Sequence, residues 1–322
     1  MDDFHYNPIE PSKMWQKKFI GASSDAIARQ YDRMWNKRPD PSRDEFYRQR
    51  IVDLCHRIVS HRITNPDFKS INWNHLQQQV KKSHNYSTGS DLYQLLYAAL
   101  TYRNLDKIFD FQEHNKKIAG QLSRVTSVYM ELWEDENWWE RLQECKIMPT
   151  RDGWMTFGRY EERKDETKLR AYLTLDPDSF SWDKICKFVN WVYDNLWLSG
   201  KFTKDPKGLV ERHEGIIMYG PDLDLDDFVE AVEETAEFLE DECDLSLLSH
   251  PTPIYFAPEP KQYFGRRQES FHMRLSGITE RIILKIMRRE PSKYRFKRKV
   301  SSAFLSEGGV FTKYLVKENL AL

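Results

Sequence analysis

The first third of the chain has hydrophobic positions that recur with the period of an α-helix. One set follows Asp40-Pro-Ser-Arg-Asp-Glu, a second set follows the predicted cap Asp91, and residues 105–121 continue the pattern. The sets consist of Phe46, Ile51, Val52, Leu54, Cys55 and Ile58, and of Leu92, Leu95, Leu96, Ala99 and Leu100. The pattern predicts a mainly helical N-terminal region over residues 1–122.

The pattern changes near residue 123. Val125, Ser127, Tyr129, Glu131 and Trp133 alternate in a way that indicates strand character, and residues 153–158, 168–175, 216–219 and 253–257 predict short strands. Amphipathic helices are predicted over 181–196, 224–242 and 269–287. We therefore expect an α+β fold with a helical N-terminal part packed on a mixed α/β part, 123–322, the two forming one continuous unit from about 45 to 290.

Charge is balanced overall but unevenly distributed. Charged residues make up 31% of the chain, yet the formal net charge is −1, which argues against a general nucleic-acid binder. Residues 222–244 carry twelve carboxylates and no Lys or Arg, whereas residues 281–299 carry nine basic residues and one acid. The basic run is interpreted as a solvated helix face, as the counterpart of the acidic helix, or as a surface for an acidic partner.

The cysteines and the apolar segments bear on the compartment. Cys55, Cys145, Cys186 and Cys243 form no CxxC pair, which favours reduced thiols over a disulfide framework or a zinc site. The N-terminus has no pattern of a signal peptide, and no stretch approaches the length of a transmembrane helix. These features favour a cytoplasmic protein with no membrane partner.

Several chemistries leave recognisable motifs that this chain lacks. It contains no GxGxxG, GxxxxGK[ST], HExxH or GxSxG motif, and no spacing of histidines and cysteines that is typical of a metal site. We therefore expect neither a nucleotide cofactor nor a bound metal.

Two basic clusters are the candidate chemistry. The first runs from Lys201 through Lys204 and Lys207 to Arg212, and the second contains Arg266, Arg267, His272 and Arg274. Arginine presents a planar fork of donors that fits phosphate oxygens, while lysine and histidine also transfer protons. If the clusters meet, they form a pocket for a phosphorylated substrate. The alternative is that the lysines belong to a solvated loop and that His272 is a partly buried, hydrogen-bonded side chain.

Six collinear segments resemble the HopA-type effector family, whose relatives act as lyases in class V lanthipeptide and thioamitide biosynthesis. The resemblance as a whole covers about residues 45–290. The first three segments are Asp91-Leu-Tyr-Gln-Leu-Leu-Tyr, Leu169-Arg-Ala-Tyr-Leu and Gly200-Lys-Phe-Thr-Lys. The others are Arg212-His-Glu-Gly-Ile-Ile-Met-Tyr219, Pro253-Ile-Tyr-Phe and Glu269-Ser-Phe-His-Met-Arg274. The departures are a missing loop before Arg159, a missing lysine after Phe256, and a shorter spacing between Ser270 and Arg274.

The resemblance implies a cofactor-free lyase. Such an enzyme eliminates phosphate from phosphoserine or phosphothreonine of a ribosomal precursor peptide, leaving dehydroalanine or dehydrobutyrine, after a separate kinase has supplied the phosphate. Lys201 is then the expected base and His272 the expected acid, with Arg212, Arg266, Arg267 and Arg274 on the phosphate. The alternative is a non-catalytic, effector-like or scaffold protein that binds a kinase or a peptide through the same basic surfaces.

Overall fold

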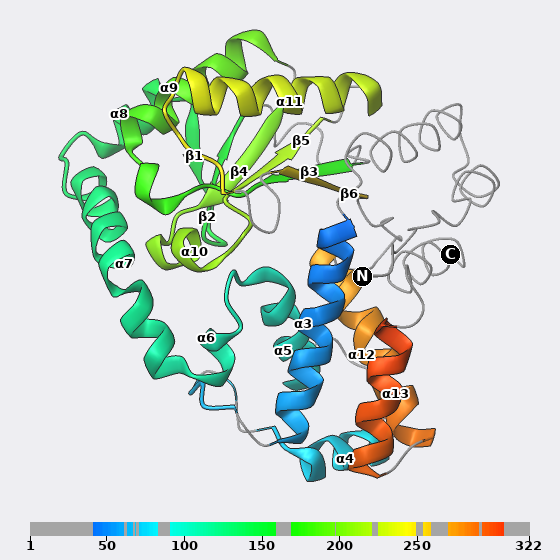
Figure 1. Cartoon of the computed structure of the whole chain (residues 1–322). Helices are drawn as coiled ribbons and strands as arrows, with labels where there is room; N and C mark the ends of the chain where they lie inside the picture. Colours follow the sequence, from blue (N-terminus) through cyan, green and yellow to red (C-terminus); the bar gives the residue numbers. More distant parts are fainter. Residues whose placement is uncertain are drawn as a thin grey trace. The chain divides into compact units, whose positions relative to one another are not determined.

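The chain folds as an α+β protein, in agreement with the sequence (Figure 1). In this computed structural model the described residues are 41–60, 63–66, 68, 71–82, 91–158, 169–196, 198–220, 225–248, 254–258, 270–289 and 292–305. The chain divides into two compact units, residues 1–116 with 263–322, and residues 117–262. The segment from residue 263 groups with the N-terminal helices rather than with the sheet.

The first unit is helical. Its helices are α3 (Pro41–Val59), α4 (Trp73–Lys82), α5 (Asp91–Thr101), α6 (Asp106–Phe109), α12 (Phe271–Arg289) and α13 (Lys293–Leu305). α12 packs against α4, α5 and α13, and α3 packs against α5 and α13. The buried Arg50 of α3 donates hydrogen bonds to the carbonyls of Ala99, Tyr102 and Arg103, which satisfies acceptors at the end of α5 that have no partner within the helix. Distant parts of the sequence thus share one core.

The second unit is built on a six-stranded antiparallel sheet. Its strands are β1 (Ile147–Pro149), β2 (Trp154–Phe157), β3 (Leu169–Leu173), β4 (Ser199–Thr203), β5 (Ile216–Tyr219) and β6 (Ile254–Pro258), in the order β1-β2-β4-β5-β3-β6. The helices are α8 (Trp138–Glu144), α9 (Trp182–Asn195), α10 (Pro206–Glu211) and α11 (Leu225–Asp241), with the 3-10 turn η1 (Pro177–Ser179). Ser181 caps α9 by accepting a hydrogen bond from the Lys184 N–H at 3.4 Å, as the sequence predicts.

Helix α7 (Phe111–Trp133) replaces the strand character expected from residue 125 onward. Val125, Tyr129 and Leu132 are buried at helical spacing, while Ser127 and Glu131 are exposed. Val125 and Tyr129 are four positions apart with Ser127 between them, so this short alternation of apolar and polar residues fits either period. The prediction of a strand here was therefore wrong.

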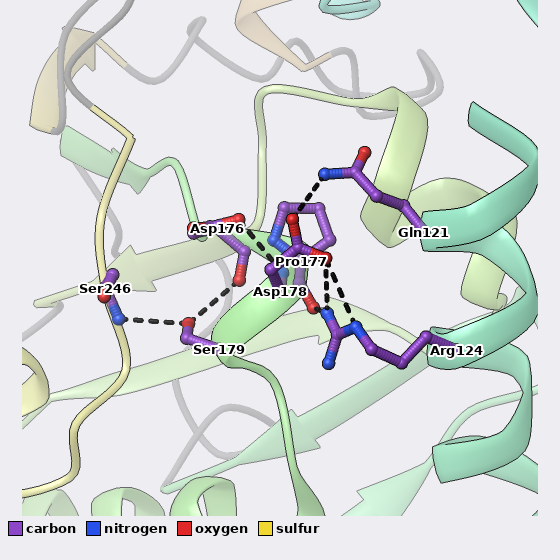
Figure 2. A network of polar contacts seen from close by, with 7 residues as sticks. All are labelled: Gln121, Arg124, Asp176, Pro177, Asp178, Ser179 and Ser246. Atoms are coloured by element: carbon purple, nitrogen blue, oxygen red, sulfur yellow. Dashed lines mark hydrogen bonds and ion pairs between the residues drawn. The ribbon is translucent and has the colours of Figure 1, made fainter. Parts of the chain in front are cut away.

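A polar network fastens α7 to the turn before α9 (Figure 2). Gln121 donates to Asp178 at 2.7 Å, and Arg124 donates to Asp178 at 3.2 Å and to the Pro177 carbonyl. On the other side of the same turn, Ser179 Oγ donates to the Asp176 carbonyl at 2.9 Å and accepts from the Ser246 N–H at 3.0 Å. The Arg124 and Asp178 side chains are 39% and 55% exposed, so we interpret this network as a surface clamp.

Two of the four cysteines form a disulfide, which contradicts the expectation of reduced thiols. Cys145 follows α8 and Cys186 lies in α9, with their Cα atoms 4.8 Å apart although 41 positions separate them in sequence. Folding creates this proximity, so spacing alone could not reveal it. Cys55 and Cys243 are free and buried. Burial raises the pKa of the Cys55 thiol to about 12 and that of Cys243 to about 11.

Candidate functional site

The two faces of the sheet carry different side chains. Lys201 of β4 lies opposite Thr156 of β2 and Ile217 of β5, and Ile217 lies opposite Tyr172 of β3. Directly paired residues share a face, and every second residue along a strand joins them. This places the following residues on one face, called here the polar face: Trp154, Thr156, Arg170, Tyr172, Ser199, Lys201, Thr203, Ile217 and Tyr219.

The opposite face is apolar and covered by helices. It carries Met155, Phe157, Gly200, Phe202, Ile216 and Met218, and its large side chains are fully buried. Phe157 packs edge-on against Phe188 of α9 with ring centroids 5.7 Å apart, and Phe202 lies 6.1 Å from the Trp182 ring at the start of α9. Figure 1 shows α9 and α11 on the same side of the strands, and α11 packs against β3. This face is the core of the unit.

Three cations and two aromatic rings alternate on the polar face. The Arg212 guanidinium carbon lies 6.0 Å from the Trp154 ring centroid, and Lys201 Nζ lies 4.5 Å from the same centroid. Lys201 Nζ is also 5.9 Å from the Tyr219 ring, over which the Arg170 guanidinium carbon lies at 5.2 Å. We call Arg212, Trp154, Lys201, Tyr219 and Arg170 the basic aromatic row.

Burial differs along this row. Arg170 and Tyr219 are buried at 5% and 4% exposure, whereas Lys201 and Trp154 are half-buried and the Arg212 side chain is 26% exposed. Positive groups beside aromatic faces are attracted by the ring quadrupole, which favours the cations in these places. One carboxylate is already close, because Glu214 lies 4.0 Å from the Arg212 guanidinium. The end of the row at Arg212 and Lys201 is the accessible one, and guanidinium and ammonium groups are the donors that anionic ligands bind.

Helix α10 positions Arg212. Asp205 caps the helix by accepting from the Lys207 N–H at 3.0 Å, Pro206 occupies its first turn, and Arg212 is its C-cap. The Arg212 guanidinium lies 4.0 Å from the carboxylate of the buried Glu214. A Cβ added at Gly208 would approach Thr203 Oγ1 to 2.6 Å, so α10 lies tightly against the Thr203 end of the polar face.

Sequence reasoning found two members of the row and missed three. It selected Lys201 and Arg212, which the structure brings to the same indole ring. It did not select Arg170, Trp154 or Tyr219 as site residues, because each belongs to a strand whose pattern predicts only structure. An arginine within the apolar strand that contains Ala171, Tyr172 and Leu173 was an available signal, since buried arginines are rare.

The second basic cluster belongs to the helical unit. His272 lies in α12 with no exposed surface, and its carbonyl accepts from Ser276 Oγ at 2.7 Å. Arg274 also lies in α12, but its side chain is outside the described part of the structure, as are Arg266 and Arg267 entirely. The roles of these four residues stay predictions.

The described part of the chain contains no group of three or more His, Cys, Asp or Glu side chains placed to hold a metal ion. Within the same residues, no helix has both the length and the apolar character needed to cross a membrane.

Comparisons of the chain with protein-family models, with curated proteins and with solved structures find no match. The resemblance to the HopA-type family thus rests on the collinear motifs of the sequence alone.

Proposed function

We propose that the chain is a lyase that eliminates phosphate from phosphoserine or phosphothreonine of a ribosomal precursor peptide, giving dehydroalanine or dehydrobutyrine. One observation carries the proposal: Lys201 and Arg212, both selected from the sequence, lie over the same Trp154 ring. Arg170 adds a third cation on the same face of the sheet. A separate kinase would supply the phosphorylated substrate.

The elimination needs three things from the site. A base removes the α-proton, donors stabilise the enolate-like carbonyl, and cations hold the phosphate as the carbon–oxygen bond breaks. Lys201 is the proposed base, because a lysine accepts a proton as a neutral amine and its Nζ lies at the accessible end of the row. Arg212 is the proposed phosphate ligand, since a guanidinium grips phosphate oxygens through two parallel hydrogen bonds. No cofactor takes part in these steps.

The buried Arg170 has a supporting part in this scheme. Its guanidinium lies over Tyr219, whose ring also faces Lys201. Arg170 therefore continues the line of cations and rings behind Lys201. His272 as acid, and Arg266, Arg267 and Arg274 as further phosphate ligands, remain predictions of the sequence.

The test is phosphate release from a phosphoserine peptide, followed by mass spectrometry for the loss of phosphoric acid. Removing a general base typically costs about 10²–10⁴ in rate, so Lys201→Ala should lower turnover by at least about a hundredfold. The matched control is Lys204→Ala, a half-buried lysine three positions on whose ammonium donates to the Thr150 carbonyl at 3.1 Å.

Turnover by Lys201→Ala at the rate of the unmodified protein would remove Lys201 as the base. Binding of the phosphopeptide by the unmodified protein without any dehydrated product would favour the docking protein over the lyase.

A further inference from the structure

The corner between α7 and α8 carries a cluster of three tryptophans, of which Trp139 is exposed and Trp133 and Trp138 are half-buried. The Trp133 and Trp138 rings meet edge-on with centroids 5.2 Å apart, and Trp138 and Trp139 do so at 5.5 Å. Trp139 is 42% exposed, and Met130, one turn before Trp133 on α7, is 43% exposed. We call Trp133, Trp138 and Trp139 the tryptophan corner. Exposed apolar groups gathered in one place are typical of interaction surfaces, and tryptophan is enriched among the residues that dominate binding energy.

The turn that presents these rings is held by hydrogen bonds. Asp135 accepts from the Asn137 N–H at 2.8 Å and from Arg141 at 3.0 Å, and the Trp138 N–H donates to the Asp135 carbonyl at 3.0 Å. The hydrogen bonds from Asn137 and Arg141 hold the pKa of Asp135 below its usual range. A surface that is ordered before binding loses less conformational entropy when a partner arrives.

The rim of the corner is strongly acidic. Residues 130–144 carry six carboxylates and a single arginine, and the exposed acids are Glu131, Glu134, Glu136, Glu140 and Glu144. The one arginine, Arg141, already lies 3.0 Å from Asp135 and 3.6 Å from Asp183. The charge that complements this surface is positive.

A cation covers another exposed ring of this unit. Tyr193 is 47% exposed, and Lys146 Nζ lies over its ring at 4.1 Å. Across the described residues, by contrast, none of the three indole rings of the corner has a cation stacked on it. Indole is the aromatic group that attracts guanidinium and ammonium most strongly.

We propose that the tryptophan corner is a docking surface for an arginine- or lysine-rich peptide segment of a partner protein. The cationic side chains stack on the indole rings, and the carboxylates of the rim attract them and fix their direction. This inference is independent of the proposed lyase activity, because none of its residues belongs to the basic aromatic row.

Binding of a fluorescent peptide of alternating arginine and glycine, followed by anisotropy, tests the proposal. The matched probe has glutamine in place of each arginine and should bind at least about fivefold more weakly. Trp139→Ala should weaken binding of the arginine peptide by about fivefold. The aromatic control is Tyr294→Ala in α13, where Tyr294 is 75% exposed, and it should leave the affinity unchanged.

A charge control separates this site from general attraction to an acidic protein. Glu136→Gln with Glu140→Gln removes two charges from the rim, whereas Glu230→Gln with Glu234→Gln removes two exposed charges from α11, which is more acidic than the rim. The first pair should weaken binding about twofold or more, and the second pair should not change it.

Three results would overturn the proposal. The first is an equal loss of affinity for the arginine peptide in the two double variants, Glu136→Gln with Glu140→Gln and Glu230→Gln with Glu234→Gln. The second is equal affinity of the unmodified protein for the arginine and glutamine peptides. The third is a self-associating protein that Trp139→Ala converts to a monomer, because the corner would then be an interface between copies of this chain.

Discussion

The two faces of the sheet are made by the same strands but differ in what they hold. One face consists of phenylalanine, isoleucine and methionine side chains packed under α9 and α11. The other consists mainly of threonine, serine, tyrosine, lysine and arginine, together with Trp154 and Ile217, and much of it is buried as well, including Thr156 at 3% and Ser199 at 2% exposure. Burial alone therefore does not separate the structural face from the candidate site.

The chemistry of the buried groups does separate them. Burying apolar surface stabilises the fold, whereas burying hydroxyls and guanidinium groups costs free energy unless hydrogen bonds or charges compensate. Lys201 and Phe202 are neighbours in β4 that point to opposite faces. Substitutions at these two positions should therefore change different properties of the protein.

Phe202→Ala should have the largest effect on stability. Removing a fully buried phenylalanine typically costs about 3–5 kcal/mol, because apolar burial is lost and a cavity remains. The paired Lys201→Ala should change the free energy of unfolding by less than about 1 kcal/mol, since it loses cation–π contacts and relieves repulsion between cations. Urea denaturation measures both. A large loss of stability in Lys201→Ala would mean that the polar face is also structural.

Gly200→Ala tests how tightly the apolar face is packed. A Cβ at this position would lie 2.4 Å from Phe157 Cζ and 2.8 Å from the Ile217 carbonyl oxygen. Either the Phe157 ring or the backbone of β5 must therefore shift to make room for it. We expect a loss of about 1–3 kcal/mol. The control is Gly120→Ala in α7, where nothing lies within 4 Å and alanine should stabilise the helix by about 0.5–1 kcal/mol. Melting temperatures that change in the same direction in both variants would contradict this description of the packing.

Tyr129→Phe should have the smallest effect. The buried Tyr129 hydroxyl donates to the Thr203 carbonyl at 2.7 Å, at the end of the strand that carries Lys201, and burial raises the pKa of this phenol. Its loss should destabilise the protein by about 1–2 kcal/mol, because the carbonyl loses its partner. Tyr193→Phe, at an exposed ring, serves as the control in the same denaturation experiment. Equal denaturation midpoints for the two variants would mean that the hydrogen bond from Tyr129 to the Thr203 carbonyl does not stabilise the end of β4.

Local patterns in the sequence predicted much of the fold. The run Ile216–Tyr219 is apolar throughout and was expected as a strand, and the amphipathic helix from Ser181 was expected with its cap. β4 was not expected, because Ser199-Gly-Lys-Phe-Thr203 mixes a glycine and a charge with only one large apolar side chain. Lys201 of this strand lies on the polar face, and a search for alternating hydrophobic residues does not detect a face made of polar side chains.

The site was harder to predict than the strands. Trp154, Arg170 and Tyr219 come from three strands, and only the register between β2, β3, β4 and β5 brings them to Lys201. Strand pairing is non-local, and a shift of one residue would move Lys201 to the opposite face. The resemblance supplied Lys201 and Arg212 without their neighbours. The Cys145–Cys186 disulfide depends in the same way on a contact that spacing does not encode.

The central claim is that the basic aromatic row binds phosphate. Its most direct test is the ratio of affinities for a phosphorylated peptide and the same peptide without phosphate, measured by calorimetry for the unmodified protein and for Arg212→Lys. Charge-assisted hydrogen bonds contribute about 1.5–3 kcal/mol each, and lysine cannot form the paired bonds of a guanidinium, so the substitution should lower this ratio about tenfold or more. Affinity for the unphosphorylated peptide should stay the same. A protein with no preference for the phosphopeptide, or a variant that loses affinity for both peptides equally, would contradict the account.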